Sequence, residues 1–102
     1  MMSPSTGSVS VTYPTFVFYT KEGCGLCAEL AHKLQGIPGL WPQIESRDIT
    51  TQPDWWDRYS LEVPVLCVVQ AGREIPLPRT SPRASMEQVQ RTIERFLADL
   101  GS

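Results

Sequence analysis

With 102 residues and a formal net charge of -2, the chain has room for one small domain. It contains no basic run, which argues against a general nucleic-acid binder, and its apolar runs fall far short of the ~20 residues that span a bilayer. Met1–Tyr13 lacks the basic and apolar regions of a secretory signal, so we expect a cytoplasmic location without membrane attachment. The three cysteines are an odd number, which argues against a framework of structural disulfides.

The first half of the chain predicts a strand, a loop and a helix. Residues 1–12 are rich in Ser, Thr, Gly and Pro, so we expect a disordered lead-in before a single domain over residues 13–102. Thr12–Thr20 predicts a strand whose centre is apolar on both faces, as in a strand covered from both sides. Lys21–Gly23 is the expected loop, and Cys24–Gln35 has the periodicity of a helix that ends at Gly36.

The second half predicts a further helix between strands, and then a longer helix. The expected elements are a strand at Gln43–Asp48, a short helix that starts within Thr50–Pro53 and ends near Ser60, a strand at Val65–Val69, a tight turn at Ala71–Arg73 and an edge strand at Glu74–Leu77. Thr50 and Thr51 offer hydroxyl caps for the short helix. Ser85 and Gln88 have the spacing of a capping box, and an apolar stripe behind them predicts the terminal helix.

The order β-α-β-α-β-β-α predicts an α/β fold with a mixed four-stranded sheet. The first two strands are joined through a helix and should be parallel, whereas the last two are joined by a short turn and should be antiparallel. Helices are expected on both faces of this sheet.

The pair Cys24 and Cys27 has the placement that thiol–disulfide exchange requires. One thiol must be ionised and exposed, and the second must be close enough to attack a mixed disulfide. Cys24 lies at the expected helix N-terminus, where free N–H groups and the helix dipole favour a thiolate, and Lys21 is near. Cys27 lies one turn further along, as the resolving thiol. Gly25 leaves the surface open above Cys24, and Leu26 offers an apolar contact to a partner.

Other roles for these residues remain open. The pair could form half of a zinc site, but Cys67 and His32 are the only obvious further ligands and neither has the spacing of a second half-site. The two thiols could also be an inert, packed pair. Cys67 lies in a buried strand and reads as a small core residue. In the last loop, Arg79 and Arg83, with Arg73 before them, could bind an anion or a peptide carboxylate, or simply face solvent.

From about residue 14 to 100, the chain resembles the glutaredoxin-like proteins of the thioredoxin-fold superfamily. The matching features are Tyr19-x-Lys21-x-x-Cys24-x-x-Cys27 after a strand, Val63-Pro64 before an apolar strand, a Gly72 turn and a terminal helix. It is most similar to the small bacterial group with Gly-Cys-x-Leu-Cys. The resemblance implies a thioredoxin-like fold, Cys24 as attacking thiol, Cys27 as resolving thiol and Pro64 in cis. Lys21, Val63 and Pro64 would contact substrate, together with Gly25 and Leu26.

Two segments depart from the family pattern. Gly25-Leu26 stands where a glutaredoxin has Pro-Tyr, and Pro76-Leu77-Pro78-Arg79 stands where it has a Gly-Gly pair and an acidic residue that hold glutathione. We therefore expect no tightly bound cofactor and no metal, with glutathione as an open alternative.

The resulting hypothesis is a thiol–disulfide oxidoreductase that cycles Cys24–Cys27 through a mixed disulfide. Its expected partners are a disulfide-bearing protein or a low-molecular-weight thiol, and a cellular reductant, with the chain acting as a monomer. The alternatives are a redox-responsive binding module with little turnover, and a zinc or iron–sulfur site.

Overall fold

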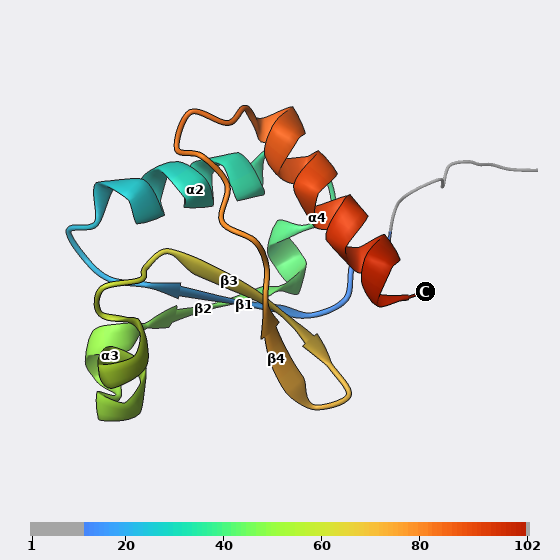
Figure 1. Cartoon of the computed structure of the whole chain (residues 1–102). Helices are drawn as coiled ribbons and strands as arrows, with labels where there is room; N and C mark the ends of the chain where they lie inside the picture. The colour runs from blue at the N-terminus through green and yellow to red at the C-terminus, as the bar shows by residue number, and fades with distance from the viewer. Residues whose placement is uncertain (1–11, 102) are drawn as a thin grey trace, which may run out of the picture.

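The structure of the chain is a computed structural model that describes residues 12–101. Its sheet lies between helices (Figure 1). In chain order the elements are β1 (Phe16–Thr20), α2 (Gly25–Gln35), a 3₁₀ turn at Trp41–Gln43, β2 (Ile44–Asp48), a 3₁₀ turn at Ile49–Thr51, α3 (Pro53–Tyr59), β3 (Val65–Gln70), β4 (Arg73–Pro76) and α4 (Met86–Leu100). The expected lead-in falls almost wholly on residues 1–11, outside the described range.

The sheet has the strand order β2-β1-β3-β4. β1 pairs in parallel with β2, across the connection that contains α2, and antiparallel with β3. β3 and β4 form an antiparallel hairpin closed by Ala71 and Gly72, both with positive φ, as a two-residue turn that matches the twist of the strands requires. The predicted mixed four-stranded sheet is therefore confirmed.

Alternation along the central strands builds a core on each face of the sheet. On one face Phe16, Phe18 and Val68 meet the apolar sides of α2 and α4. On the other face Val17, Tyr19 and Cys67 lie under α3. α2 and α4 lie on one side of the sheet and α3 on the other, so the expectation of helices on both faces is confirmed (Figure 1).

The apolar stripe predicted for the terminal helix is also confirmed. Every member packs into the larger core: Met86, Val89, Ile93, Phe96, Leu97 and Leu100. The capping box forms as expected, because the Ser85 hydroxyl accepts the Gln88 N–H while the Gln88 side chain accepts the Ser85 N–H.

α3 starts within the predicted range Thr50–Pro53, but the hydroxyl caps predicted for it are wrong. Thr50 and Thr51 do not cap it, because they belong to a separate 3₁₀ turn whose cap is the Asp48 carboxylate. α3 begins at Pro53 behind Gln52, which makes no side-chain capping bond. Asp48 attracts the Thr50 N–H and hydroxyl together, so the hydroxyls serve this turn and not the helix.

β4 forms one edge of the sheet, and its unpaired outer side offers few backbone N–H donors. It begins one residue earlier than expected and ends at Pro76. The Leu77 N–H donates to the Leu66 carbonyl, so alternate residues from Arg73 to Leu77 bond inward to β3. Glu74, Pro76 and Pro78 therefore point their backbone nitrogens outward, and only Glu74 carries an N–H there.

A polar network crosses the α3 face of the sheet. Arg47 on β2 donates to the Tyr19 hydroxyl and to Glu74 on β4, both at 2.9 Å, and its side chain also pairs with Glu45. The guanidinium lies over the rings of Tyr19 and Trp55. These contacts supply hydrogen-bond acceptors and ring contacts to the partly buried Arg47 guanidinium. They lie on the sheet face that the short helix α3 covers only in part.

Candidate active site

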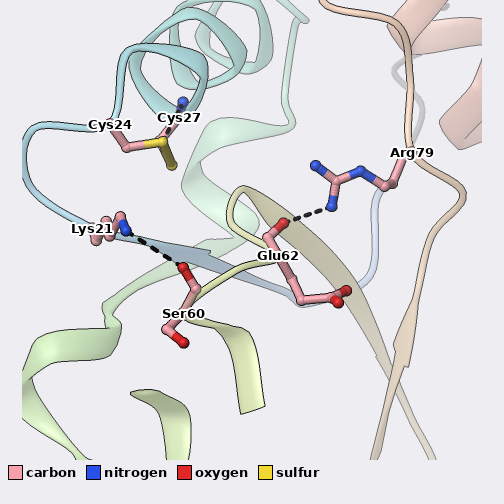
Figure 2. The surroundings of a disulfide bond; sticks show 6 residues. All are labelled: Lys21, Cys24, Cys27, Ser60, Glu62 and Arg79. Atoms are coloured by element: carbon pink, nitrogen blue, oxygen red, sulfur yellow. Dashed lines mark hydrogen bonds between the residues drawn. A yellow bond between two sulfur atoms is a disulfide. The ribbon is translucent and has the colours of Figure 1, made fainter. Parts of the chain in front are cut away.

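Cys24 and Cys27 form a disulfide at the N-terminal end of α2 (Figure 2). Cys24 is the N-cap of this helix, one position before the first helical residue Gly25, so the predicted start at Cys24 is one residue early. Gly23 brings the chain from β1 into the helix with φ +81°, a backbone conformation that favours glycine. The Cys24 N–H donates to the Lys21 carbonyl at 3.3 Å and closes this loop.

The two sulfur atoms have different surroundings. Cys24 is half-buried, whereas Cys27 is only 2% exposed. The Cys27 N–H donates to the Cys24 sulfur at 3.1 Å, and the first turn of α2 contains no acidic residue. A thiolate on Cys24 would therefore meet a helix N-terminus that stabilises negative charge. The Cys24 sulfur is therefore both the more accessible of the two and the one on which negative charge is stabilised.

Lys21 faces the loop that follows α3. Its amine donates to the Ser60 carbonyl at 3.4 Å and lies 5.5 Å from the centre of the Trp56 ring. Trp56 itself is 43% exposed, while its neighbour Trp55 packs against the core under α3. Lys21 thus joins the loop before Cys24 to the segment before Pro64, a tertiary contact that the sequence analysis missed.

The remaining sequence-predicted residues surround the disulfide. Gly25 is exposed, and a Cβ added there would meet nothing within 4 Å. Leu26, between the cysteines, is 47% exposed. Val63 and Pro64 are half-buried, and the peptide bond between them is cis.

Two hollows lie beside Pro64, and Arg79 lines both. The inner hollow, of about 140 Å³, lies between Leu30, Pro64 and the residues Val89, Thr92 and Ile93 of α4. The outer hollow, of about 100 Å³, lies between Leu26 on α2 and the segment Arg79–Pro82. Leu30, Pro64, Arg79 and Thr80 line both hollows, so these form neighbouring depressions at the dithiol end of α2.

Arg79 reaches toward the disulfide side of the molecule. Its guanidinium donates to the Glu62 carbonyl at 2.6 Å, and Figure 2 shows its side chain extending from the segment after β4 toward the loop that carries Glu62. Arg79 and Arg83 line a common surface hollow beside α4, whereas Arg73 begins β4 at the hairpin turn and lies apart from them. Of the three, Arg79 is the one that lines the outer hollow beside the dithiol.

Cys67 lies apart from this site, in the core under α3. It is fully buried and forms no disulfide. Burial raises the pKa of its thiol to about 11, and the nearby Glu74 charge adds to that rise. The expectation that Cys67 is a core residue is confirmed.

Possible metal ligands near the cysteines are few in the part of the chain that the structure describes. His32 is exposed on α2. Across residues 12–101, no group of three or more His, Cys, Asp or Glu side chains is placed to hold an ion. The same part of the chain has no helix long and apolar enough to cross a membrane.

A family model matches the part of the chain that contains the dithiol and Pro64. The model of the glutaredoxin-like domain (DUF836) covers residues 15–94, which include every element from β1 to most of α4. The chain belongs to the glutaredoxin-like domain family. The resemblance inferred from the sequence is therefore confirmed at the level of the family.

Solved structures support the fold of this glutaredoxin-like domain. Thioredoxin 1 from Thermosipho africanus TCF52B is 21% identical, with a TM-score of 0.57 over 86% of this chain and 99% of that chain. The structural-genomics target protein XcR50 from X. campestris is 20% identical, with a TM-score of 0.53 over 79% of this chain and 97% of that chain. At these identities the likeness concerns the fold. No curated protein matches the chain.

Proposed function

We propose that this glutaredoxin-like domain is a thiol–disulfide oxidoreductase that uses Cys24 and Cys27. The observation that supports the proposal best is the asymmetry of the pair, with Cys24 accessible at the helix N-cap and Cys27 buried within bonding distance of it. The thiol that attacks a substrate disulfide must be an accessible thiolate. The thiol that later releases the substrate must lie close to it but be too buried to react with substrate itself.

In the reductive direction the reduced protein begins the cycle. The Cys24 thiolate attacks one sulfur of a substrate disulfide, so a Cys24–substrate disulfide forms and the other substrate sulfur leaves as a thiolate. The Cys27 thiolate then attacks the Cys24 sulfur. The second substrate thiolate leaves and the Cys24–Cys27 disulfide remains, so two electrons have passed to the substrate.

The described disulfide is the oxidised end of this cycle, and a cellular thiol reductant would restore the dithiol. We propose a protein disulfide as the substrate, with glutathione or another small thiol as the alternative. We also propose that the domain acts as a monomer in a reducing compartment such as the cytoplasm, without a tightly bound cofactor. Gly25, Leu26, Val63 and Pro64 would contact the substrate next to Cys24, and Lys21 would position the loop before Pro64 through Ser60.

Turnover with insulin as a disulfide substrate and dithiothreitol as reductant tests the proposal. Cys24→Ser should lower the rate to the uncatalysed background, because no attacking thiolate remains. In a separate incubation without dithiothreitol, pre-reduced Cys27→Ser should accumulate a mixed disulfide with insulin, visible as a mass increase on the protein. Cys67→Ala is the matched control and should keep the wild-type rate, because Cys67 lies buried under α3. Wild-type turnover by Cys24→Ser would rule out this mechanism.

A further inference from the structure

The outer hollow combines an apolar wall with two positive charges. Leu26 and Leu30 of α2 form one side with Pro64, and Arg79 lies across from them. Lys33, one turn beyond Leu30, also lines the hollow and donates to the Pro82 carbonyl at 2.9 Å. Because Leu26 stands between the two cysteines, the hollow begins at the edge of the dithiol.

Arg79 and Lys33, the two cations of the outer hollow, have no anionic partner among residues 12–101. The ion pairs within residues 12–101 are those of Arg47 with Glu45 and with Glu74. Arg79 and Lys33 each donate to a neutral backbone carbonyl. The one carboxylate that lines the hollow is Glu29, which is exposed and unpaired with either cation in the described part of the chain.

Arg79 is held in place while most of its donors stay available. A guanidinium carries five N–H donors in a planar fork, and the Arg79 side chain uses only its terminal nitrogen Nη1 for a hydrogen bond within residues 12–101. The Glu62 carbonyl fixes the direction of the side chain, so less conformational entropy is lost when a ligand binds. A carboxylate is the ligand that this fork geometry fits best.

We propose that the outer hollow binds an acidic side chain of the substrate polypeptide, which makes Arg79 a specificity-determining residue. The carboxylate of an Asp or Glu close in sequence to the substrate cysteine would accept from Arg79. The methylene groups of that side chain would lie against Leu26 and Pro64. The inference rests on the proposed function, because it names the kind of disulfide substrate that the Cys24–Cys27 pair reduces.

Peptide binding tests this site independently of turnover. The probe is a set of short peptides with Ser in place of Cys and one Glu moved through the flanking positions, each paired with a peptide that has Gln there. The protein is the Cys24→Ser, Cys27→Ser double variant, which cannot exchange. We expect the Glu peptide to bind about fivefold more tightly at one or more positions, the effect of a partly exposed ion pair. Added salt should reduce the preference.

Arg79→Gln should abolish the preference, because its amide can still donate to the Glu62 carbonyl but carries no charge. Arg73→Gln is the matched control with the same change in net charge at the hairpin turn, and it should keep the preference. Equal binding of Glu and Gln peptides at every position overturns the proposal, as does a preference that survives Arg79→Gln. Displacement of the Glu peptide by glutathione at lower concentration than by the peptide itself would overturn the polypeptide assignment. Failure of the proposed function would show instead as absent insulin turnover in the wild-type protein.

Discussion

The environment of each sulfur determines which cysteine can react. Cys24 accepts an N–H at the start of a helix, whereas Cys67 is enclosed by Val17, Tyr19 and Ile49. Burial and the Glu74 charge raise the pKa of Cys67 to about 11, although a hydrogen bond with Tyr59 opposes the rise. Since only the thiolate reacts, Cys67 is doubly protected, by its protonation and by its lack of exposure.

Alkylation should separate the cysteines. With the pKa of Cys67 at about 11, roughly one Cys67 thiol in a thousand is ionised at about pH 8. Iodoacetamide should therefore label Cys24 of the reduced native protein and leave Cys67 unmodified, and peptide mass spectrometry would locate the label. Unfolding in guanidinium should make Cys67 as reactive as a cysteine in a short peptide. Labelling of native Cys67 at that unfolded rate would contradict its burial.

Glu74 should make the stability depend on pH. The hydrogen bond from Tyr19 and, next, the Arg47 guanidinium lower the pKa of this carboxyl. A lowered folded-state pKa stabilises the fold above the unfolded pKa of about 4.3, and this contribution is lost as the pH falls through the folded value. Glu74→Gln should thus reduce the free energy of unfolding by about 0.5–1 kcal/mol at about pH 7, since the side chain is partly exposed.

Urea unfolding at neutral and at strongly acidic pH would measure the Glu74 effect. The difference between wild type and Glu74→Gln should shrink as the pH falls below the unfolded pKa, and it should vanish below the lowered folded-state pKa, where the carboxyl is neutral in both states. Glu29→Gln is the control, since the Glu29 side chain makes no hydrogen bond or ion pair with other residues between 12 and 101. If Glu74→Gln changes the free energy of unfolding equally at both pH values, the charge of the Glu74 carboxylate does not contribute to stability.

Among the elements, α4 depends most clearly on a local sequence signal. Ser85 and Gln88 satisfy each other's backbone N–H groups at 3.1 and 2.8 Å. Ser85→Ala removes the acceptor for the Gln88 N–H and should destabilise the protein by about 1 kcal/mol, measured as a lower urea midpoint. Ser85→Asp keeps an acceptor at the N-cap and should lie close to wild type. Equal stability of the alanine variant and wild type would mean that tertiary packing alone holds this helix end.

The elements that the sequence predicts well are those with local signals. The capping box, the β3–β4 turn and the dithiol at the N-terminal end of α2 each involve residues within four positions of one another, so their geometry follows from short-range chemistry. The hydroxyl caps predicted for α3 are wrong because the Asp48 carboxylate accepts from both the N–H and the hydroxyl of Thr50, and the sequence alone does not show which acceptor is used. Neither 3₁₀ turn was predicted, since such turns share their residue preferences with ordinary loops.

At the scale of the whole molecule, the sequence predicts the fold class but not the walls of the site. The alternation of apolar residues and the short last turn indicate a mixed sheet. The contacts of Lys21 with Ser60 and of Arg79 with Glu62 join segments 39 and 17 residues apart. Such contacts depend on the packed positions of separate elements, so the outer hollow became visible only in the structure.

The outer edge of β4 should protect the molecule from self-association. Pro76 and Pro78 face outward without N–H groups, so an approaching strand finds too few donors to pair. The double variant Pro76→Val, Pro78→Val introduces two backbone N–H donors and two strand-forming side chains. It should self-associate in concentrated solution, as light scattering would detect. Pro38→Val, in an exposed turn outside the sheet, is the control. A monomeric double-valine variant at the same concentration would contradict this role of the edge.

The Arg47–Glu74 ion pair has a consequence for the order in which the sheet is assembled. These residues belong to β2 and β4, the two outer strands, and β1 and β3 lie between them. The pair can form only after all four strands have found their places, so it is absent from a folding transition state in which any strand is still detached. An interaction made that late slows the escape from the native state and leaves the rate of folding nearly unchanged. The Arg47–Glu74 ion pair therefore slows unfolding of the completed sheet, and its loss would raise the unfolding rate and shorten the lifetime of the native molecule.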